Sequence, residues 1–514
     1  MALVSLLNFN QTQLRVAAET ALKVLPGSPV WNPQDPNAYN DFGGTIKNMI
    51  RTPIRDDRQR AKGVSVGVDA VGSYSSDFVY PALKHTFPSF FYAAFRNFAE
   101  FGGAGQITAV TTSTFTAASG LTVFIVGDLV LAAGFSNILG NNGLKRATTV
   151  TATVLTVAET MVAETPPATA TLVKVGFQTT AGDLDVSVAG ALPVITSTAF
   201  NPVTQGILPG MWVYFGDDTT GLLSFTNAAN NGWKRVRAVT ATSMTIDKSR
   251  LPMVAETNTT QTVRIFLGRT IKNETGTTIV RNSVQFERTL GAPDDALPAQ
   301  VQSEYIIGCV GNELSFNYKP QDKLMCDLAF VGCDVEYRTG AVGVKTGTRP
   351  NLPELPAYNT SSAVKRIKLA VVSNTSVAPT PLAGEVLDLK MTIKNNVKAI
   401  NVIGVFGAFE LVAGDFEVSA DIEALFLTTA AVDSVRNNAD VTMDIIQVQG
   451  NQAFTCDMPL ITLGNGRANV SKDDPIKLSL GLEANSGEQV DTTLDHTLLM
   501  NFFDFVPNIA TTLS

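Results

Sequence analysis

The chain has 514 residues, enough for roughly three or four domains on the usual size prior. Charged residues make up only 16% of it, below the ~25% typical of soluble globular proteins, and the formal net charge is −8. Residues 350–514 hold 10 Lys and Arg against 19 Asp and Glu, so the negative charge is concentrated there. This balance argues against tight nucleic-acid binding, which needs cations to neutralise phosphates.

We expect neither export nor a membrane span from the N-terminal segment and the apolar stretches of the sequence. The first 20 residues contain a short apolar run but no basic leader and no cleavage signal of the usual kind. The longest apolar stretch, residues 399–414, is interrupted by Asn401 and Glu410, so we expect no membrane span.

The first notable segment is residues 51–63, "RTPIRDDRQRAKG". Basic side chains dominate it, but Asp56 and Asp57 lie in its middle and no aromatic residue is present for base stacking. We expect a mixed-charge arm that contacts another subunit, with a solvated loop as the alternative and nucleic-acid binding as a distant third.

A strand and a helix are predicted to follow this arm. Alternate residues from Val64 to Ala70 are apolar, which indicates a half-buried strand. Phe87, Phe91 and Phe95 then recur every four residues, with Ala94 and Phe98 widening the stripe. The pattern predicts a helix packed on a sheet, and a hydrophobic ligand groove is the functional alternative.

Two related modules are predicted from an internal repeat. "NNGLKRATTVTATVLTV" begins at Asn141 and "NNGWKRVRAVTATSMTI" at Asn230, and "MVAET" occurs at Met161 and Met253. Neither copy of the first phrase contains His, Cys or an acidic residue, so the repeat indicates architecture and not chemistry.

Each module, residues 104–176 and 177–267, is expected to be a small all-β unit. Val150, Ala152 and Val154 alternate with threonines, which predicts a strand with threonine facing water. The Asn-Gly pairs predict tight hairpin turns with positive φ angles.

The flanks of the two modules, residues 1–103 and 268–345, are expected to join into one domain. The stretch around "GNELSFNYKPQDKLMCDLAFVG" predicts two strands that turn near Pro320 and Gln321. Pro350, Pro353 and Pro356 then predict a stiff linker over residues 346–360.

Residues 361–514 repeat the plan of the first domain in faint form. A strand from Asp415 is followed by a short predicted helix capped by Thr428 or Thr429, and a strand, turn and strand come later. Residues 387–393 and 400–409 are expected to form a long apolar hairpin that pairs with another chain.

No residues are assigned to a catalytic, cofactor-binding or metal site, and no cofactor is expected. The sequence contains none of the phosphate-binding, dinucleotide, zinc-protease or serine-hydrolase motifs. The four cysteines show no close pairs and are expected to be free and mostly buried, and His85 and His496 to be packed or surface residues.

Several segments together resemble the tail tube proteins of long-tailed bacteriophages. They are "RTPIRDDRQRAKGVSVGVDAVGSYSSD", the doubled Asn-Asn-Gly phrases, and "FGAFELVAGDFEVSADIEALF" followed by "AVDSVRNNADV". The resemblance covers nearly the whole chain and rests on structural motifs.

The resemblance implies a mainly β fold with two tail-tube-type β-sandwich or barrel domains, each with a flanking helix, plus the two inserted modules. It also implies homo-oligomeric rings that stack into a tube, with tape measure, terminator and distal tail proteins as partners. DNA would be present only in transit, no membrane would be involved, and the protein would be assembled in the host cytoplasm into the virion tail. Since two tube domains lie in one chain, we expect a trimeric ring with pseudo-sixfold symmetry.

The alternative is a surface adhesion or carbohydrate-binding protein built of tandem β-sandwiches, and an enzyme is third. Aromatic residues on module loops would favour adhesion, but only Trp212 and Trp233 stand out, where the first copy has Leu129 and Leu144.

Overall fold

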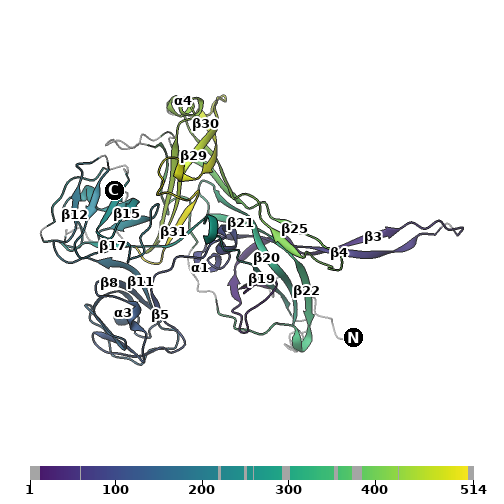
Figure 1. Cartoon of the computed structure of the whole chain (residues 1–514), viewed down its shortest axis with the longest axis horizontal. Coiled ribbons are helices and arrows are strands. Elements are labelled where there is room, and N and C mark those ends of the chain that lie inside the picture. Colours follow the sequence, from purple (N-terminus) through teal and green to yellow (C-terminus); the bar gives the residue numbers. More distant parts are fainter. Residues whose placement is uncertain are drawn as a thin grey trace.

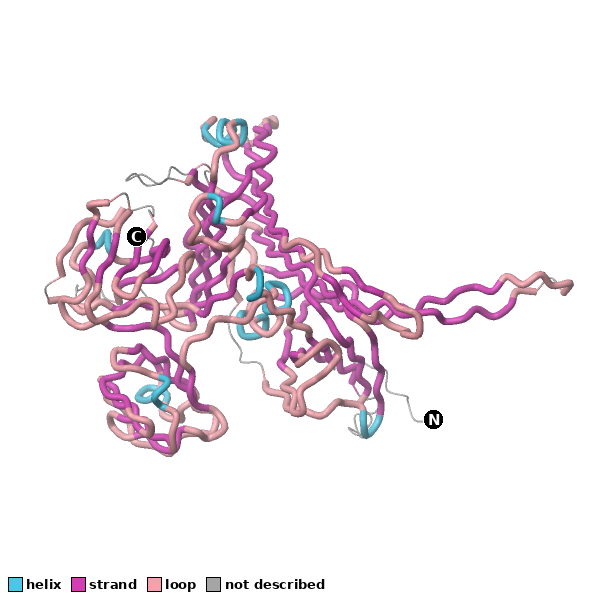
Figure 2. Tube along the Cα trace, in the orientation of Figure 1, coloured by secondary structure: helices cyan, strands magenta, loops and turns pink. Residues whose placement is uncertain are grey.

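The computed structural model describes residues 12–507, except residues 58, 191, 218–221, 248–251, 259, 292–300, 352–356, 373–381, 383–384 and 427. Antiparallel strands dominate the chain (Figures 1 and 2), and they form two large sheets and one two-stranded sheet. The predicted mainly β fold class is therefore confirmed.

The larger sheet has sixteen strands drawn from both ends of the sequence. They are β1 (Gln13–Ala18), β2 (Asn32–Gln34), β3 (Pro36–Arg51), β4 (Ala61–Asp77), β18 (Arg269–Lys272), β19 (Val284–Gly291), β20 (Gln302–Tyr318), β21 (Met325–Gly332), β22 (Asp334–Thr339), β23 (Val364–Val371), β24 (Val386–Lys394), β27 (Glu417–Leu425), β28 (Val441–Gln449), β29 (Gln452–Asn469), β30 (Lys477–Asn485) and β31 (Leu499–Phe503).

Two groups of four strands lie side by side in this sheet in the same order. The first group is β3-β4-β21-β20 and the second is β24-β27-β30-β29. In each group the second strand leads into a helical segment, and the last two strands form a hairpin. An antiparallel ladder between β20 and β24 joins the groups.

The second sheet has thirteen strands and contains both repeated modules. They are β5 (Glu100–Gly102), β6 (Ile107–Val110), β7 (Thr114–Ala117), β8 (Asp128–Ala133), β9 (Gly143–Val150), β10 (Val154–Val157), β11 (Thr171–Gln178), β12 (Asp185–Ser187), β13 (Val194–Thr196), β14 (Trp212–Phe215), β15 (Gly232–Val239), β16 (Ser243–Ile246) and β17 (Arg264–Phe266). Pairing of β11 with β17 joins the modules, and each module keeps its own hydrophobic core.

Helices are short and few among the described residues: α1 (Tyr80–Leu83), α2 (Phe87–Phe91), α3 (Ile138–Asn141) and α4 (Ala430–Arg436). Thr429 occupies the position before α4, as expected, although its side chain makes no capping hydrogen bond. The predicted turn near Pro320 and Gln321 is confirmed, since β20 and β21 flank it and Gln321 has a φ of 56°.

The prediction of one long helix through the phenylalanine stripe was wrong in the extent of the helix. Two separate helices form, because Pro88 lacks the N–H that a continuous helix would need there. Tyr92, with a φ of 51°, ends α2 before Phe95. The packing was predicted correctly, since Phe87, Phe90 and Phe91 are buried in the core of the larger sheet.

The prediction of tight hairpin turns at the Asn-Gly pairs was also wrong. Gly143 and Gly232 do have positive φ angles, but Asn142 and Asn231 are extended. Each asparagine instead holds a longer loop: Asn142 accepts from the Phe135 N–H and donates to its carbonyl, both at 3.0 Å. Asn231 does the same with Phe225, at 2.9 and 2.8 Å.

The other repeated side chains hold the same loop. Nζ of Lys145 donates to the Gly140 carbonyl at 3.0 Å, and Nζ of Lys234 donates to the Ala229 carbonyl at 2.9 Å. Glu164 accepts from the Asn137 N–H, and Glu256 accepts from the N–H of the matching Asn227. The repeated residues therefore stabilise the same loop in both modules.

The threonine-rich part of each repeated phrase forms a hairpin and not a single strand. β9 ends at Val150, residues 151–153 turn, and β10 begins at Val154. Ala147, Leu155 and Val157 are the buried residues, so the predicted buried face was displaced from the real one.

The predicted hairpin of residues 387–393 with 400–409 was wrong. Both sides of β24 are already used, by β20 and β27. The second segment turns at Gly404, which has a φ of 91°, and only β25 (Lys398–Ile400) and β26 (Glu410–Val412) pair there.

Candidate assembly edges and channel face

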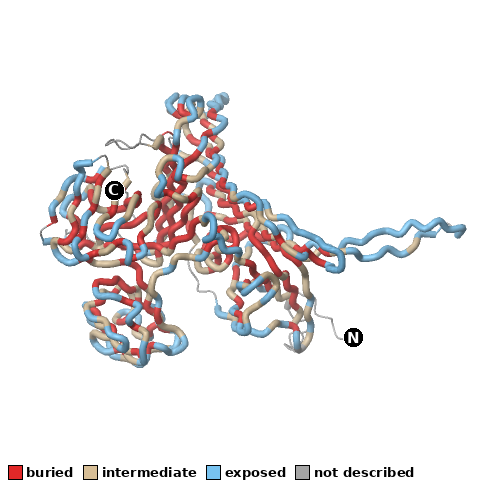
Figure 3. The backbone as a smooth tube through the Cα atoms, in the orientation of Figure 1, coloured by how far each residue is buried: buried red, intermediate tan, exposed pale blue. Residues whose placement is uncertain are grey.

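Residues 51–63 lie at the tip of a long hairpin formed by β3 and β4. This hairpin projects away from the rest of the chain (Figure 1), and its distal half is exposed (Figure 3). Ile50 is 65% exposed and Ile54 fully exposed, although side chains of this kind are usually buried. No described residue outside the hairpin covers its tip.

A second exposed apolar segment lies beside the base of this hairpin. The Val68 N–H donates to the Phe406 carbonyl at 3.2 Å, and a hollow of about 260 Å³ lies between the hairpin base and residues 401–406. Ile403 is fully exposed and Phe406 is 49% exposed. We give the name apolar crown to two segments together. They are the distal part of the hairpin, between the paired residues Ile46 and Val68, and residues 400–412.

The two four-stranded groups present one continuous polar face. Alternation is strict in β27, where Val418, Ala420 and Ile422 are buried and the intervening residues point away from the core. Across the junction, the hydroxyls of Ser315 and Thr392 lie 3.1 Å apart on this polar face.

Acidic side chains outnumber basic ones on this polar face. The acidic residues are Asp41, Asp69, Asp77, Glu313, Asp327, Asp388, Glu417, Asp421, Glu423 and Glu483, and the basic residues are Lys47, Lys390, Lys394, Arg467 and Lys477. We call this surface the acidic face.

Both outer strands of the acidic face have an unpaired side. In the described residues β3 pairs only with β4. β29 pairs with β30 on one side, and β28 covers its other side only as far as Ile461. Unpaired strand edges of this kind template pairing with another chain. Figure 1 places the edges at the two ends of the sheet, β29 beside β30 and β3 on the projecting hairpin.

The second module is fixed to the larger sheet by aromatic packing. Trp212 is 1% exposed and Trp233 is 6% exposed, and both lie in a cluster with Ile446, Val448 and Phe503. The rings of Trp233 and Phe503 meet edge to face at 5.1 Å. The two tryptophans are therefore not exposed on module loops, where the adhesion hypothesis needed them.

Buried charges border this aromatic cluster. Arg235 contacts Asp457 at 3.0 Å and Asp247 at 3.1 Å, and Nε2 of His496 lies 3.2 Å from Asp457. Burial alone would lower the pKa of Arg235, but the surrounding carboxylates outweigh it and raise that pKa. Arg366 pairs with buried Asp444, whose pKa is raised because burial outweighs the attraction of the guanidinium.

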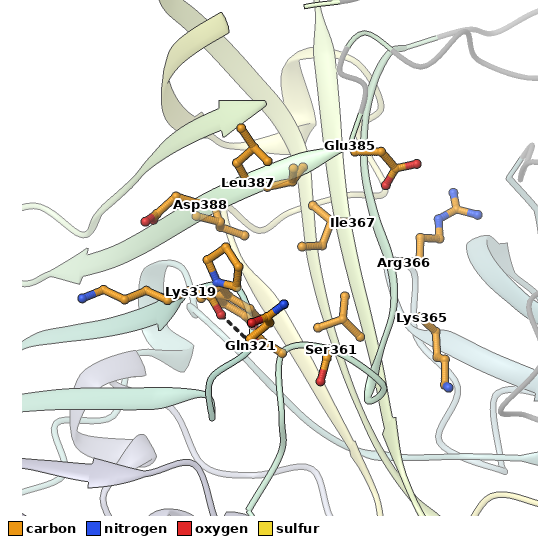
Figure 4. Close-up of a pocket in the computed structure, with 15 residues that line it drawn as sticks. Lys319, Gln321, Ser361, Lys365, Arg366, Ile367, Glu385, Leu387 and Asp388 are labelled. Carbon is orange, nitrogen blue, oxygen red and sulfur yellow. Dashed lines mark hydrogen bonds between the residues drawn. The ribbon is translucent and has the colours of Figure 1, made fainter. Parts of the chain in front are cut away.

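One open hollow of about 400 Å³ lies where the β20–β21 loop approaches β23 and β24 (Figure 4). Its charged side chains include Lys319, Lys365, Arg366, Glu385 and Asp388. Two of them are already engaged, Arg366 with Asp444 and Lys365 with the Ser362 carbonyl at 2.7 Å. Among the described residues that line it there is no His or Cys for nucleophilic chemistry.

The cysteine prediction is confirmed, since Cys309, Cys326, Cys333 and Cys456 are all free and buried. Burial raises the pKa of Cys333 to about 11. His496 is fully buried and His85 is partly buried. Within the described ranges, no three His, Cys, Asp or Glu residues are grouped as a metal site.

Sequence reasoning identified the projecting arm but missed the other assembly features. It placed no residue on the acidic face and expected the pairing edge in residues 387–409, whereas the open edges are β3 and β29. The alternating charges of β27 were visible in the sequence, but which side of each strand stays unpaired depends on neighbours distant in sequence.

Comparison with known proteins identifies the family. No helix in the part of the chain that the structure describes has the length and apolar content to cross a membrane. A search among curated proteins gave no match. The family model described as phage tail tube protein matches residues 174–484, which is more than half of the chain, and the chain therefore belongs to the phage tail tube protein family.

Proposed function

We propose that copies of this chain form closed rings, that the rings stack into the tail tube, and that phage DNA passes through it into the host. Membership of the phage tail tube protein family gives the chain a structural role in the virion tail tube. The single observation that carries this proposal is a continuous run of eight strands, β3-β4-β21-β20-β24-β27-β30-β29, whose two end strands each have an unpaired edge in the described residues.

Ring closure follows from these two edges because they are different. Pairing of the β29 edge of one copy with the β3 edge of the next is a head-to-tail contact, and repetition of such a contact closes a ring when the rotation allows it. Closing the ring removes both of these exposed edges, as in a β-barrel.

Three chains per ring is the stoichiometry that the repeated strand order supports. Each chain supplies two groups of four strands in the same order, so three chains supply six similar units around one axis. In this proposal residues 1–103 with 268–345 make the first tube domain and residues 361–514 the second, joined by residues 346–360.

The acidic face is proposed to line the channel. DNA carries one negative charge per ~1.7 Å of its length, so a wall with surplus carboxylates repels the phosphates and prevents tight binding. The opposite face of the same strands is occupied by the hydrophobic core and cannot be the solvent-filled side.

Stacking of rings is assigned to the apolar crown. It projects from one end of the strands that build the ring, so it would meet the next ring along the axis. The two modules, residues 104–176 and 177–267, would lie outside the tube, as decoration or for weak attachment to surface sugars. Assembly would occur in the host cytoplasm with tape measure, terminator and distal tail proteins.

The test is electron microscopy of the purified full-length chain over a range of concentrations. Stacked rings with a central hole are the expected result, and the number of subunits per ring can be counted in end views. Discrete monomers at high concentration, together with glycan binding, would favour the tandem-sandwich adhesion alternative.

A further inference from the structure

We propose that residues 464–470, which are the end of β29 and the residue after it, form an antiparallel ladder with residues 39–45 of β3 in a second copy of this chain. The register would be the one that already joins β20 to β24 inside each chain. This inference rests on the proposed tube function and specifies which residues of two copies meet.

The equivalence of strands comes from two hairpins with loops of equal length, since Asn317 pairs with Met325 and Asn469 pairs with Lys477. Leu328 and Leu480 each lie three residues after the second member of these pairs, so they correspond. Leu328 of β21 lies between Leu314 and Tyr74, whereas Leu480 of β30 lies between Asn465 and Ile422. Leu314 therefore corresponds to Asn465, and Tyr74 corresponds to Ile422. Since Tyr39 pairs with Tyr74 and Leu389 pairs with Ile422, Tyr39 corresponds to Leu389.

The internal junction supplies the register. Inside one chain Asn317 pairs with Lys390, and Tyr318 pairs with Leu389. The equivalent residues are Asn469 and Asp41, then Val470 and Tyr39. Each pair would join two different copies, because β29 and β3 lie at opposite ends of the sheet.

The required side of β29 is the open one. At the junction, β24 lies on the side of β20 that β19 covers as far as Cys309. The corresponding side of β29 is covered by β28 as far as Ile461, and no described strand continues from there. On β3, the carbonyl of Phe42 accepts a long hydrogen bond from Arg288 at 3.4 Å, which a ladder bond could replace.

The side chains along this register are complementary. Val470 is 74% exposed and would lie opposite half-buried Tyr39, and β-branched with aromatic residues make favourable cross-strand pairs. Arg467 and Asp41 are both exposed on the acidic face and would be diagonal neighbours of opposite charge. The pairing thus covers an otherwise unexplained exposed valine.

The test is disulfide cross-linking with the full chain carrying Asp41→Cys and Asn469→Cys. The four native thiols are buried, so mild oxidation acts on the engineered pair. The control carries Thr45→Cys and Asn469→Cys, which the proposed register separates by four more residues, about 13 Å along the strand, too far for a disulfide.

We expect assembled Asp41→Cys/Asn469→Cys protein to convert almost fully to a covalent trimer on a non-reducing gel, and the control to remain monomeric. The pairing is overturned, but the tube function stands, if the control variant cross-links. The same holds if neither variant cross-links in intact tubes. If the largest cross-linked species on the gel contains six chains, the register is kept and the ring is a hexamer and not a trimer. If neither the variants nor the native chain form rings, the proposed function is overturned, and the pairing with it.

Discussion

Single side chains hold the loops of the repeated modules in place. Asn142 and Asn231 each bind both the N–H and the carbonyl of a phenylalanine whose ring fills the module core. The sequence predicted that the repeat is architectural, because it lacks reactive groups. It did not predict the loop clamp, since the same Asn-Gly letters also favour a tight turn.

The Asn142→Ala change should lower the free energy of unfolding of the first module by about 1–3 kcal/mol, because buried backbone groups of Phe135 lose their partner. Urea unfolding followed by circular dichroism would measure the loss, since residues 104–176 contain no Trp or Tyr for intrinsic fluorescence. Thr149→Ala is the matched control, because Thr149 is exposed, and an equal loss in both variants would contradict the clamp.

His85 should make the protein less stable in acid. Burial, with a contribution from Lys84, lowers the pKa of His85 to about 4, whereas an unfolded histidine has a pKa near 6.5. Between these values the unfolded chain binds a proton that the folded chain does not, so the free energy of unfolding falls as the pH is lowered.

The expected loss between pH 6.5 and 4 is about 1–2 kcal/mol, and His85→Gln should flatten this part of the pH profile. Chemical unfolding of both proteins at several pH values gives the comparison. An unchanged slope in the variant would assign the acid sensitivity to other groups.

Elements were predictable where local pattern decided them. β27 was recognised because buried residues alternate with more exposed ones along its whole length. The phenylalanine stripe correctly indicated packing, but Pro88 divided the helix. Residues 387–409 were mispaired because the partners of β24 lie far away in the sequence, on β20 and β27.

At this scale the second module is more than an appendage, since its strands β14 and β15 pack on the larger sheet. Trp233→Ala should cost about 3–5 kcal/mol and release the module from that sheet. Limited proteolysis and a separate thermal transition would report the release. Leu144→Ala, at the half-buried equivalent position of the first module, should cost less, and equal costs would argue against a special docking role for Trp233.

For the whole molecule, family and fold class could be predicted from the sequence, whereas the acidic face and the open edges required the strand order. That order depends on which distant strands become neighbours, and it decides which residues can meet another copy.

Shortening the projecting arm should separate ring formation from ring stacking. Replacing residues 52–60 with an Asn-Gly turn removes Ile54 but leaves β3 residues 39–45 intact. We expect single rings without long tubes, because the edges that close a ring are retained. Electron microscopy would show this, with Ile54→Val as the conservative control, and long tubes from the shortened chain would exclude the arm as the stacking contact.

The β20–β24 ladder has a consequence for the kinetics of assembly. A sixfold circle built from separate one-unit subunits needs six partners to meet, whereas here half of the contacts are formed during folding of each chain. Covalent tethering replaces a micromolar encounter with a local concentration of roughly millimolar or higher. In the proposed ring of three, formation of the nucleus would therefore depend on the third power of subunit concentration and not the sixth, and tubes would initiate while the protein is still scarce.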